Sequence, residues 1–227
     1  MASDEIRVVS VGPSRALLVS LGAPHDTLSW AIVNGGRRRA DAVVWRQVQR
    51  FELGPDVDAR AVMRDTLEHL GVPSAIGLLT ARDVRRYEEA RAARGDIWAR
   101  CVATVGFGNA LTVGDPPSPP TTGTINLLCQ VSTPLAEEAL LEACALAAEA
   151  RTAAVLEARV PSGVSGRPAT GTGTDCIVVA APIGTGDVTS FAGKHTACGS
   201  AVGAAVYEAV ARAVGTWLEE NEAWPRT

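Results

Sequence analysis

Two short apolar runs, Arg7-Val-Val-Ser-Val11 and Ala16-Leu-Leu-Val-Ser20, are joined by the turn signal Gly12-Pro13-Ser14. So short a connection joins antiparallel strands, because a parallel crossover needs about a dozen residues. A further run at Leu28–Val33 has Ala42–Val48 as its expected hairpin partner. The beginning of the chain therefore predicts antiparallel sheet.

Helical and strand patterns alternate in the rest of the chain. Helical patterns cover 56–70, 81–94, 134–156 and 195–219, and strand patterns cover 75–79, 98–105, 124–131 and 176–181. Strands in succession, followed by this alternation, predict an α/β fold in which helices cover a mixed β-sheet in a layered sandwich. We assign residues 1–227 to one such domain.

Composition limits the class of protein. The 227 residues are 47% hydrophobic, enough to bury a core, and a net charge of −4 provides no basic field for nucleic acid or anionic lipid. The chain begins without a secretion signal, and no uncharged run approaches the roughly 18 residues that cross a bilayer. We expect a cytoplasmic protein with no nucleic-acid or membrane partner, and leave a homo-oligomer open.

Cysteine usage also favours a cytoplasmic protein, and histidine usage bears on metal binding. The five cysteines are widely spaced and contain no C-x-x-C pair, which is typical of free thiols in a reducing compartment. The three histidines are scattered and form no zinc motif, so we expect no metal site.

Two segments on either side of a short apolar run carry the chemistry. Ala169-Thr-Gly-Thr-Gly-Thr-Asp175 offers flexible backbone, hydroxyls and a carboxylate, and Phe191-Ala-Gly-Lys-His-Thr196 contains Lys194, the single lysine of the chain. Neither segment fits a nucleotide-binding motif, because Val188 stands where a phosphate loop needs glycine. A glycine-rich turn, an acid and an acid/base pair so close in sequence indicate a catalytic site.

Each of these residue types has a chemical use and a structural alternative. Amides of Gly171, Thr172, Gly173 and Thr174 could converge on an anion or oxyanion, or form an ordinary turn. Asp175 could orient His195 or activate water, or hydrogen-bond the amides of its own turn.

His195 and Thr196 are expected at the N-terminus of the last helix, where the macrodipole keeps imidazole neutral and suited to a general base. Lys194 could polarise a carbonyl there, or be a solvated cation. Asn109 and Asn126 each follow a glycine-containing turn, where they bind amide groups or cap the turn.

Four segments together resemble the adenosylcobinamide amidohydrolase family of corrinoid salvage enzymes. They are Thr104–Ala110 with Gly114-Asp115, Gly123-Thr-Ile-Asn126, Ala169–Asp175, and Ala192–Thr196 with Gly199. The resemblance runs from about Trp30 to about Leu218, and departs from the family pattern at Gly108, Ala197 and Ser200.

The resemblance implies hydrolysis of the amide that joins the aminopropanol arm to the corrin ring of adenosylcobinamide. The products are adenosylcobyric acid and aminopropanol, with the corrinoid as substrate and no cofactor. The expected catalytic residues are His195, Asp175 and Lys194. The expected substrate-binding residues are Gly171, Thr172, Gly173, Thr174, Asn109, Gly123, Thr124, Asn126 and Thr196.

In this reading His195 or Asp175 activates water, and the amides of residues 171–174 hold the oxyanion together with Lys194. The mechanism requires the threonine-glycine bend and the start of the last helix to face each other across one cleft. A covalent route through Thr124, Thr172 or Cys198 is also open. So are two other functions: a corrinoid-binding protein without catalysis, and an amidase for a different bulky substrate.

Overall fold

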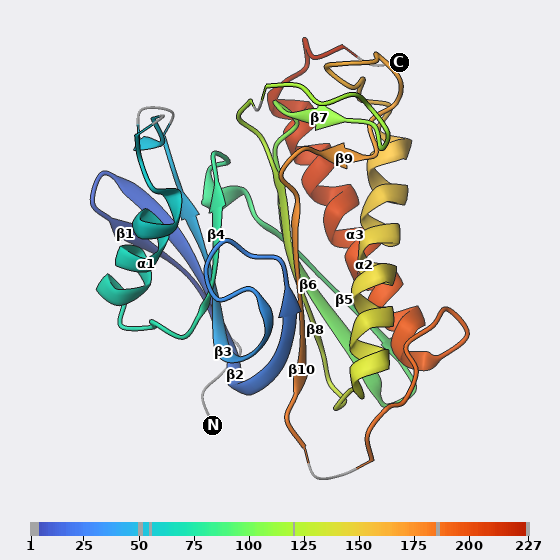
Figure 1. Cartoon of the computed structure of the whole chain (residues 1–227). Helices are drawn as coiled ribbons and strands as arrows, with labels where there is room; N and C mark the ends of the chain where they lie inside the picture. The colour runs from blue at the N-terminus through green and yellow to red at the C-terminus, as the bar shows by residue number, and fades with distance from the viewer. Residues whose placement is uncertain (1–4, 50–51, 55, 120, 185–186, 226–227) are drawn as a thin grey trace.

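The computed structural model describes residues 5–49, 52–54, 56–119, 121–184 and 187–225 (Figure 1). Along the chain its strands and helices are β1 (Ile6–Val11), β2 (Ser14–Ser29), β3 (Gly36–Gln47), α1 (Ala59–His69), β4 (Ile76–Thr80), the 3₁₀ turn η2 (Val84–Arg86), β5 (Glu88–Arg94), β6 (Ile97–Val105), β7 (Ala110–Leu111), β8 (Ile125–Val131), α2 (Glu137–Glu157), β9 (Gly171–Thr172), β10 (Cys176–Pro182) and α3 (Ala197–Glu220).

In the described part of the chain, eight strands form one sheet. Its order is β4-β3-β2-β10-β8-β6-β5, with β1 paired to β2. The pairs β8–β10 and β3–β4 are parallel, whereas the other pairs are antiparallel. The expected mixed sheet is therefore confirmed.

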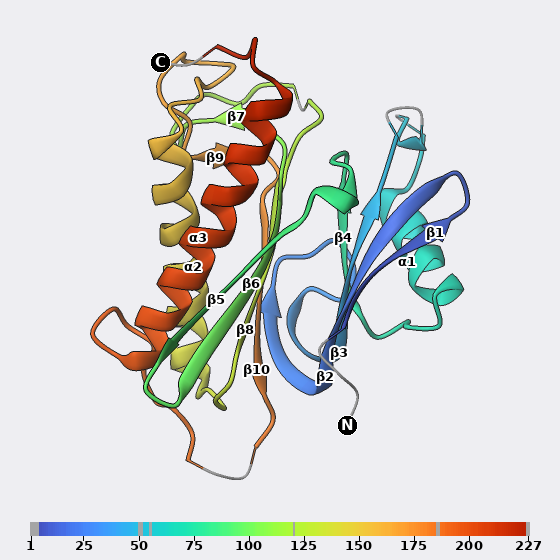
Figure 2. The same ribbon diagram turned by 180° about the vertical axis from the view of Figure 1, so that it is seen from behind.

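The long strand β2 joins two parts of this sheet. Residues 14–19 of β2 pair with β1, whereas residues 25–29 pair with β10, and the pairing with β3 shifts register between Ser20 and His25. The sheet therefore divides into an N-terminal half (β1–β4) and a C-terminal half (β5, β6, β8 and β10). Figure 1 and Figure 2 show α2 and α3 together on the C-terminal half, and α1 on the N-terminal half.

Apolar side chains of both halves pack against each other between the helices. This inner core contains Leu17, Leu21, Trp45, Leu78, Val102, Leu128 and Val178, all at most 2% exposed. A second core lies between the C-terminal half and α2 with α3, and a third lies under α1. The layers thus run helix, sheet, sheet, helix, which confirms the predicted layered α/β sandwich.

The helix predicted over 81–94 is wrong. Only the short turn η2 forms there, and residues 88–94 are strand β5, paired antiparallel with β6 around Gly95, whose φ is +58°. Arg, Glu and Ala favour helix locally, but pairing with the buried strand β6 overrides that weak preference. The strand predicted at 16–20 is confirmed as part of β2, but the break after it is wrong, because β2 runs unbroken to Ser29, and the strand predicted at 28–33 ends there.

The other three predicted helices are confirmed. Asp58 caps α1 by accepting a hydrogen bond from the Arg60 amide, and Thr196 caps α3 by accepting one from the Gly199 amide at 2.9 Å. Such side-chain caps satisfy amides that have no partner within the helix. Within the described residues, no helix is long and apolar enough to cross a bilayer.

Candidate active site

A cavity of about 470 Å³ lies between side chains of the two half-sheets. We call it the interlayer cavity. Its apolar wall includes Ile32, Leu53 and Leu78, and its polar residues are Thr80, Thr121, Thr122, Thr124, Asn126 and Thr174, with Cys176 beside them. Its volume and largely apolar lining are those of a site for a small molecule or for part of a larger one.

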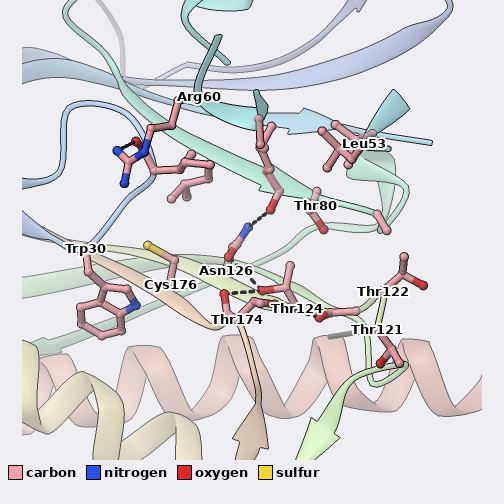
Figure 3. A pocket seen from close by; sticks show the side chains of 17 residues that line it. Trp30, Leu53, Arg60, Thr80, Thr121, Thr122, Thr124, Asn126, Thr174 and Cys176 are labelled. Carbon is pink, nitrogen blue, oxygen red and sulfur yellow. Dashed lines mark hydrogen bonds between the residues drawn. The ribbon is translucent and has the colours of Figure 1, made fainter. Parts of the chain in front are cut away.

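The polar floor of the interlayer cavity comes from β8, β10 and the residues just before them. Because side chains alternate across a strand, Thr124 and Asn126 face the cavity, whereas Ile125 lies in the helix-side core. The Thr124 hydroxyl lies 2.9 Å from the Thr174 carbonyl oxygen, to which it donates, and 3.4 Å from Asn126 Oδ1. Figure 3 shows these three residues close together.

Asn126 ties this floor to the opposite half-sheet. Its Nδ2 donates to the Leu79 carbonyl oxygen at 2.8 Å, and the residue is only 1% exposed. A buried amide in this position is fixed by the bonds at both of its ends. The Asn126 side chain therefore bridges β8 and β4 across the cavity.

The backbone before Thr124 needs glycine. Gly123 has a φ of +144°, and a Cβ added there would lie 2.6 Å from the Gly108 nitrogen and 2.7 Å from the Asn109 nitrogen. The turn at Gly106–Asn109 therefore packs directly against Gly123. The Gly106 amide also donates to the Thr124 carbonyl at 3.0 Å, which holds the residue from its backbone side.

The Asp175 side chain points toward α2 and does not line the interlayer cavity. Its carboxylate accepts hydrogen bonds from the Ile125 and Thr172 amides, both at 3.0 Å, and from the Thr172 hydroxyl, and forms an ion pair with Arg151 of α2. Burial raises the pKa of Asp175, and the Arg151 guanidinium opposes that rise. The alternative interpretation, that Asp175 binds the amides of its own turn, is the one that the contacts match.

The turn amides are likewise occupied within the protein. Thr172 N donates to Asp175, and Gly173 N donates to the Asn109 carbonyl at 3.1 Å. The Arg151–Asp175 ion pair packs directly against Gly171, where a Cβ would meet both side chains. The amides of Thr172 and Gly173 are thus engaged in holding the bend together.

Lys194 lies on a different part of the surface. It forms an ion pair with Glu149, and the two side chains are 65% and 57% exposed. Lys194 lines a groove between α2 and α3, of about 270 Å³, together with Ser200 and Tyr207. His195 is exposed beside it, and the Thr196 side chain is engaged in capping α3.

The expected shared cleft between the bend and the helix start is wrong. Lys194 and Asp175 pair with residues two positions apart on α2, Glu149 and Arg151, and such residues point about 200° apart around a helix. Moreover, β10 carries the chain away from Asp175 for seven residues, or about 23 Å. Figure 1 shows α3 beginning far from β9 and ending near it.

Of the two asparagines, only Asn126 lines the interlayer cavity. Asn109 lines a neighbouring cavity, where its Oδ1 accepts from the Thr121 hydroxyl at 3.3 Å.

Two residues that the sequence had not marked as site residues also line the interlayer cavity. Trp30 is 52% exposed, and its Nε1 donates to the Asp175 carbonyl at 2.6 Å. Arg60, in the first turn of α1, donates to the Ile32 carbonyl at 2.7 Å. Trp30 could have been marked as a site residue only if β2 were known to end at Ser29, because only then is the tryptophan expected to be exposed. Arg60 has no such signal, because its sequence context is that of an ordinary cation on a helix surface.

Residues 2–222 match the family described as adenosylcobinamide amidohydrolase. The chain belongs to the adenosylcobinamide amidohydrolase family. The match confirms the resemblance found in the four motifs and extends it over nearly the whole chain. This protein is accordingly an amidohydrolase that cleaves the aminopropanol amide of adenosylcobinamide.

Other comparisons are more distant. No curated protein matches the chain. Among solved structures, a Burkholderia sp. beta-aminopeptidase is similar at 13% identity and a TM-score of 0.48, covering 94% of this chain and 84% of its own. The L-aminopeptidase D-Ala-esterase/amidase of Ochrobactrum anthropi is similar at 14% identity and a TM-score of 0.44, covering 92% and 82%.

Within the described residues, no cluster of three or more His, Cys, Asp or Glu side chains has the arrangement of a metal site. The five cysteines are free thiols, and Cys176 is the one that lines the interlayer cavity. Burial raises the pKa of Cys176 to about 11, so the group stays a thiol at neutral pH.

Proposed function

We propose that the interlayer cavity is where this amidohydrolase holds and cleaves the side-arm amide of adenosylcobinamide. Three of the four family segments meet at its floor, and that convergence carries the proposal. Gly123–Asn126 supplies the floor, the turn at Gly106–Asn109 packs behind Gly123, and the bend at 171–175 supplies Thr174.

The residues that line the cavity suit the aminopropanol arm of the substrate, which carries the amide and extends from a large ring with apolar edges. Ile32, Leu53 and Leu78 offer apolar surface for the arm, and burying that surface favours binding by about 25 cal/mol per Å². Trp30 stands half-exposed among the lining residues, fixed through its indole nitrogen, and offers a flat face to a flat macrocycle. The ring itself would remain largely outside.

The floor provides polar groups where the amide would lie. Thr124 and Asn126 are 6% and 1% exposed, so the interactions of their polar groups with substrate occur out of water. Polar groups fixed in such a site act more strongly than in solvent, because little reorganisation is needed during reaction. Water is the second substrate, and the corrinoid is substrate rather than cofactor.

The proposal places the protein in the cytoplasm, in agreement with its five free thiols, and gives it a small-molecule partner. Nucleic acid and membrane play no part in it. A homo-oligomer is compatible with it.

A pair of matched variants tests the location. Ala81 is exposed and lines the interlayer cavity, whereas Ala197 is exposed at the start of α3. We expect Ala81→Trp to obstruct the cavity and lower kcat/KM by about tenfold or more, and Ala197→Trp to leave it within about threefold. Release of aminopropanol, followed by mass spectrometry, measures both.

The reverse pattern would move the site to the start of α3. Binding of adenosylcobinamide by wild-type protein without any release of aminopropanol would instead favour the non-catalytic corrinoid-binding protein. Cleavage of other bulky amides in a substrate panel, but not of cobinamides, would favour a different amidase.

A further inference from the structure

The interlayer cavity contains several groups able to attack a carbonyl carbon, and their contacts and burial together distinguish them. Cys176 is a buried thiol whose raised pKa, about 11, keeps it protonated, with Ser29 Oγ 3.6 Å from its sulfur. Thr174 donates its hydroxyl proton to the Gly123 carbonyl at 3.1 Å. Thr80 accepts from the Arg82 amide at 3.0 Å, so one of its lone pairs is occupied.

Three of the threonine hydroxyls that line the cavity, those of Thr121, Thr124 and Thr174, have only acceptors as partners in the described contacts, and Thr124 is the buried one: it is 6% exposed, whereas Thr121 and Thr174 are exposed. Both partners of the Thr124 hydroxyl, the Thr174 carbonyl oxygen and Asn126 Oδ1, are acceptors. A hydroxyl has one proton and two lone pairs, so this arrangement directs the proton into the protein. Within the described contacts no donor occupies the lone pairs of Thr124 Oγ1, which leaves them for an electrophile.

The backbone around Thr124 is also held on both sides. The Thr124 carbonyl accepts from the Gly106 amide, the next amide, Ile125 N, donates to Asp175, and Gly123 before it allows no side chain. Asp175 is itself held by Arg151. These contacts immobilise the backbone on both sides of the residue, which is what positioning of a nucleophile requires.

We propose that Thr124 Oγ1 is the nucleophile of the amide hydrolysis, an inference that rests on the proposed function of the interlayer cavity. Thr124 Oγ1 forms a bond to the amide carbonyl carbon, and the C–N bond then breaks. The hydroxyl proton ends on the leaving nitrogen, so aminopropanol departs as the neutral amine. The corrinoid acid remains as an ester of Thr124.

Water completes the reaction. It adds to the ester carbonyl, the bond between the acyl carbon and Thr124 Oγ1 breaks, and one proton returns to that oxygen. The second step yields the corrinoid acid and regenerates the hydroxyl, so no oxidant, reductant or further reactant is needed. In this scheme Asp175 and Arg151 are positioning residues, because they act on Thr124 through the backbone of Ile125.

Three variants test the assignment. Thr124→Val keeps the shape and removes the hydroxyl, Thr124→Ser keeps a hydroxyl, and Thr66→Val removes a buried hydroxyl that bonds only within α1. We expect Thr124→Val to lose more than about 10³-fold in kcat, beyond the loss of one oxyanion donor, and Thr124→Ser to retain part of the activity. Thr66→Val should match wild type.

A second measurement does not depend on how well a variant folds. Wild-type protein is mixed with adenosylcobinamide, quenched in acid and digested, and the peptide that contains Thr124 is examined by mass spectrometry. We expect an adduct equal to the corrinoid acid less one water. Added hydroxylamine should divert this ester to a hydroxamate in wild type but not in Thr124→Val.

The outcomes separate the two proposals. If wild-type protein turns over and Thr124→Val is equally active, the assignment of Thr124 as nucleophile is overturned. An adduct on a different residue of the wild-type protein would overturn it too. In both cases the cavity remains the proposed site. A wild-type protein that releases no aminopropanol overturns the proposed function and this assignment with it. Equilibrium dialysis of Thr124→Val with adenosylcobinamide should show binding close to wild type, which excludes loss of the site as the cause.

Discussion

Two regions of this chain carry family motifs of similar specificity, and the fold uses them differently. In the strand-end region, made of Gly123–Asn126 and 171–176, Thr124, Asn126 and Cys176 are buried and line a cavity. The helix-start region, Ala192–Gly199, presents Lys194 and His195 to solvent. A motif therefore identified the family, whereas burial and contacts were needed to tell which motif surrounds a cavity.

The helix-start region has a structural explanation of its own. Thr196 caps α3, and Glu142 of α2 accepts a hydrogen bond from the Ala192 amide at 2.7 Å. A Cβ at Gly199 would lie 2.2 Å from the carbonyl oxygens of both Ala192 and Gly193. Glycine there lets the loop fold tightly onto the first turn of α3 and fixes where that helix begins.

The two ion pairs made with α2, Asp175–Arg151 and Lys194–Glu149, give the largest expected difference between the regions. Asp175→Asn leaves the Arg151 guanidinium, 14% exposed, without its counter-charge, and removing one member of a buried pair costs about 3–5 kcal/mol. Lys194→Met breaks an exposed pair, which is worth about 0–1 kcal/mol. Urea unfolding of both variants measures the difference in the free energy of unfolding.

The catalytic reading of Asp175 makes the opposite prediction. If Asp175 were the base, Asp175→Asn would unfold like wild type and lose its turnover. A stable and inactive Asp175→Asn protein would therefore break the comparison.

Glycine replacements in the two regions are expected to have a smaller effect on stability, and only one of them should also lower kcat. Gly123→Ala and Gly199→Ala both force a Cβ against backbone atoms, so each should lose at least about 2 kcal/mol of stability. Gly123→Ala should also lose kcat, because it displaces Thr124, whereas folded Gly199→Ala should keep it. Gly203→Ala on α3 meets open space and should gain about 0.5–1 kcal/mol.

Thermal unfolding and single-turnover rates below the transition of each variant supply both quantities. Equal loss of kcat in Gly123→Ala and Gly199→Ala would mean that the two regions act as one site after all.

The smallest effects are expected at the exposed basic side chains. His195→Ala and Lys194→Ala should each stay within about threefold of wild type in kcat/KM and within about 0.5 kcal/mol in stability, as exposed residues outside the site do. Initial rates of aminopropanol release at saturating and limiting substrate measure the first quantity. A loss above about 10²-fold in His195→Ala, typical of a general base, would restore the original mechanism.

Local signals were enough for much of the fold. The apolar runs, turn residues and caps predicted four helices, of which three are confirmed, and the mixed sheet, because those elements bury the residues that their own patterns mark. The helix predicted over 81–94 is wrong because that charged, alanine-rich sequence favours helix locally. The structure of residues 88–94 depends instead on pairing with β6, a contact that local sequence does not contain.

Several residues of the site were predictable from sequence, but which of them lie together in space was not. Thr124, Asn126 and Thr174 were expected to bind substrate, and they do line one cavity. The grouping of Asp175 with His195 failed because nearness along the chain was taken for nearness in space, although a strand lies between them. Trp30 and Arg60 join the cavity through the folding of the sheet at β2, which no short segment encodes.

The cobalt of the substrate offers the most direct measurement. A crystal of Thr124→Val grown with adenosylcobinamide and measured at the cobalt absorption edge would locate the metal by its anomalous signal. The account predicts a peak beside Trp30, outside the interlayer cavity, with the aminopropanol arm directed toward residue 124. A peak over the groove between α2 and α3, beside Lys194, would contradict it.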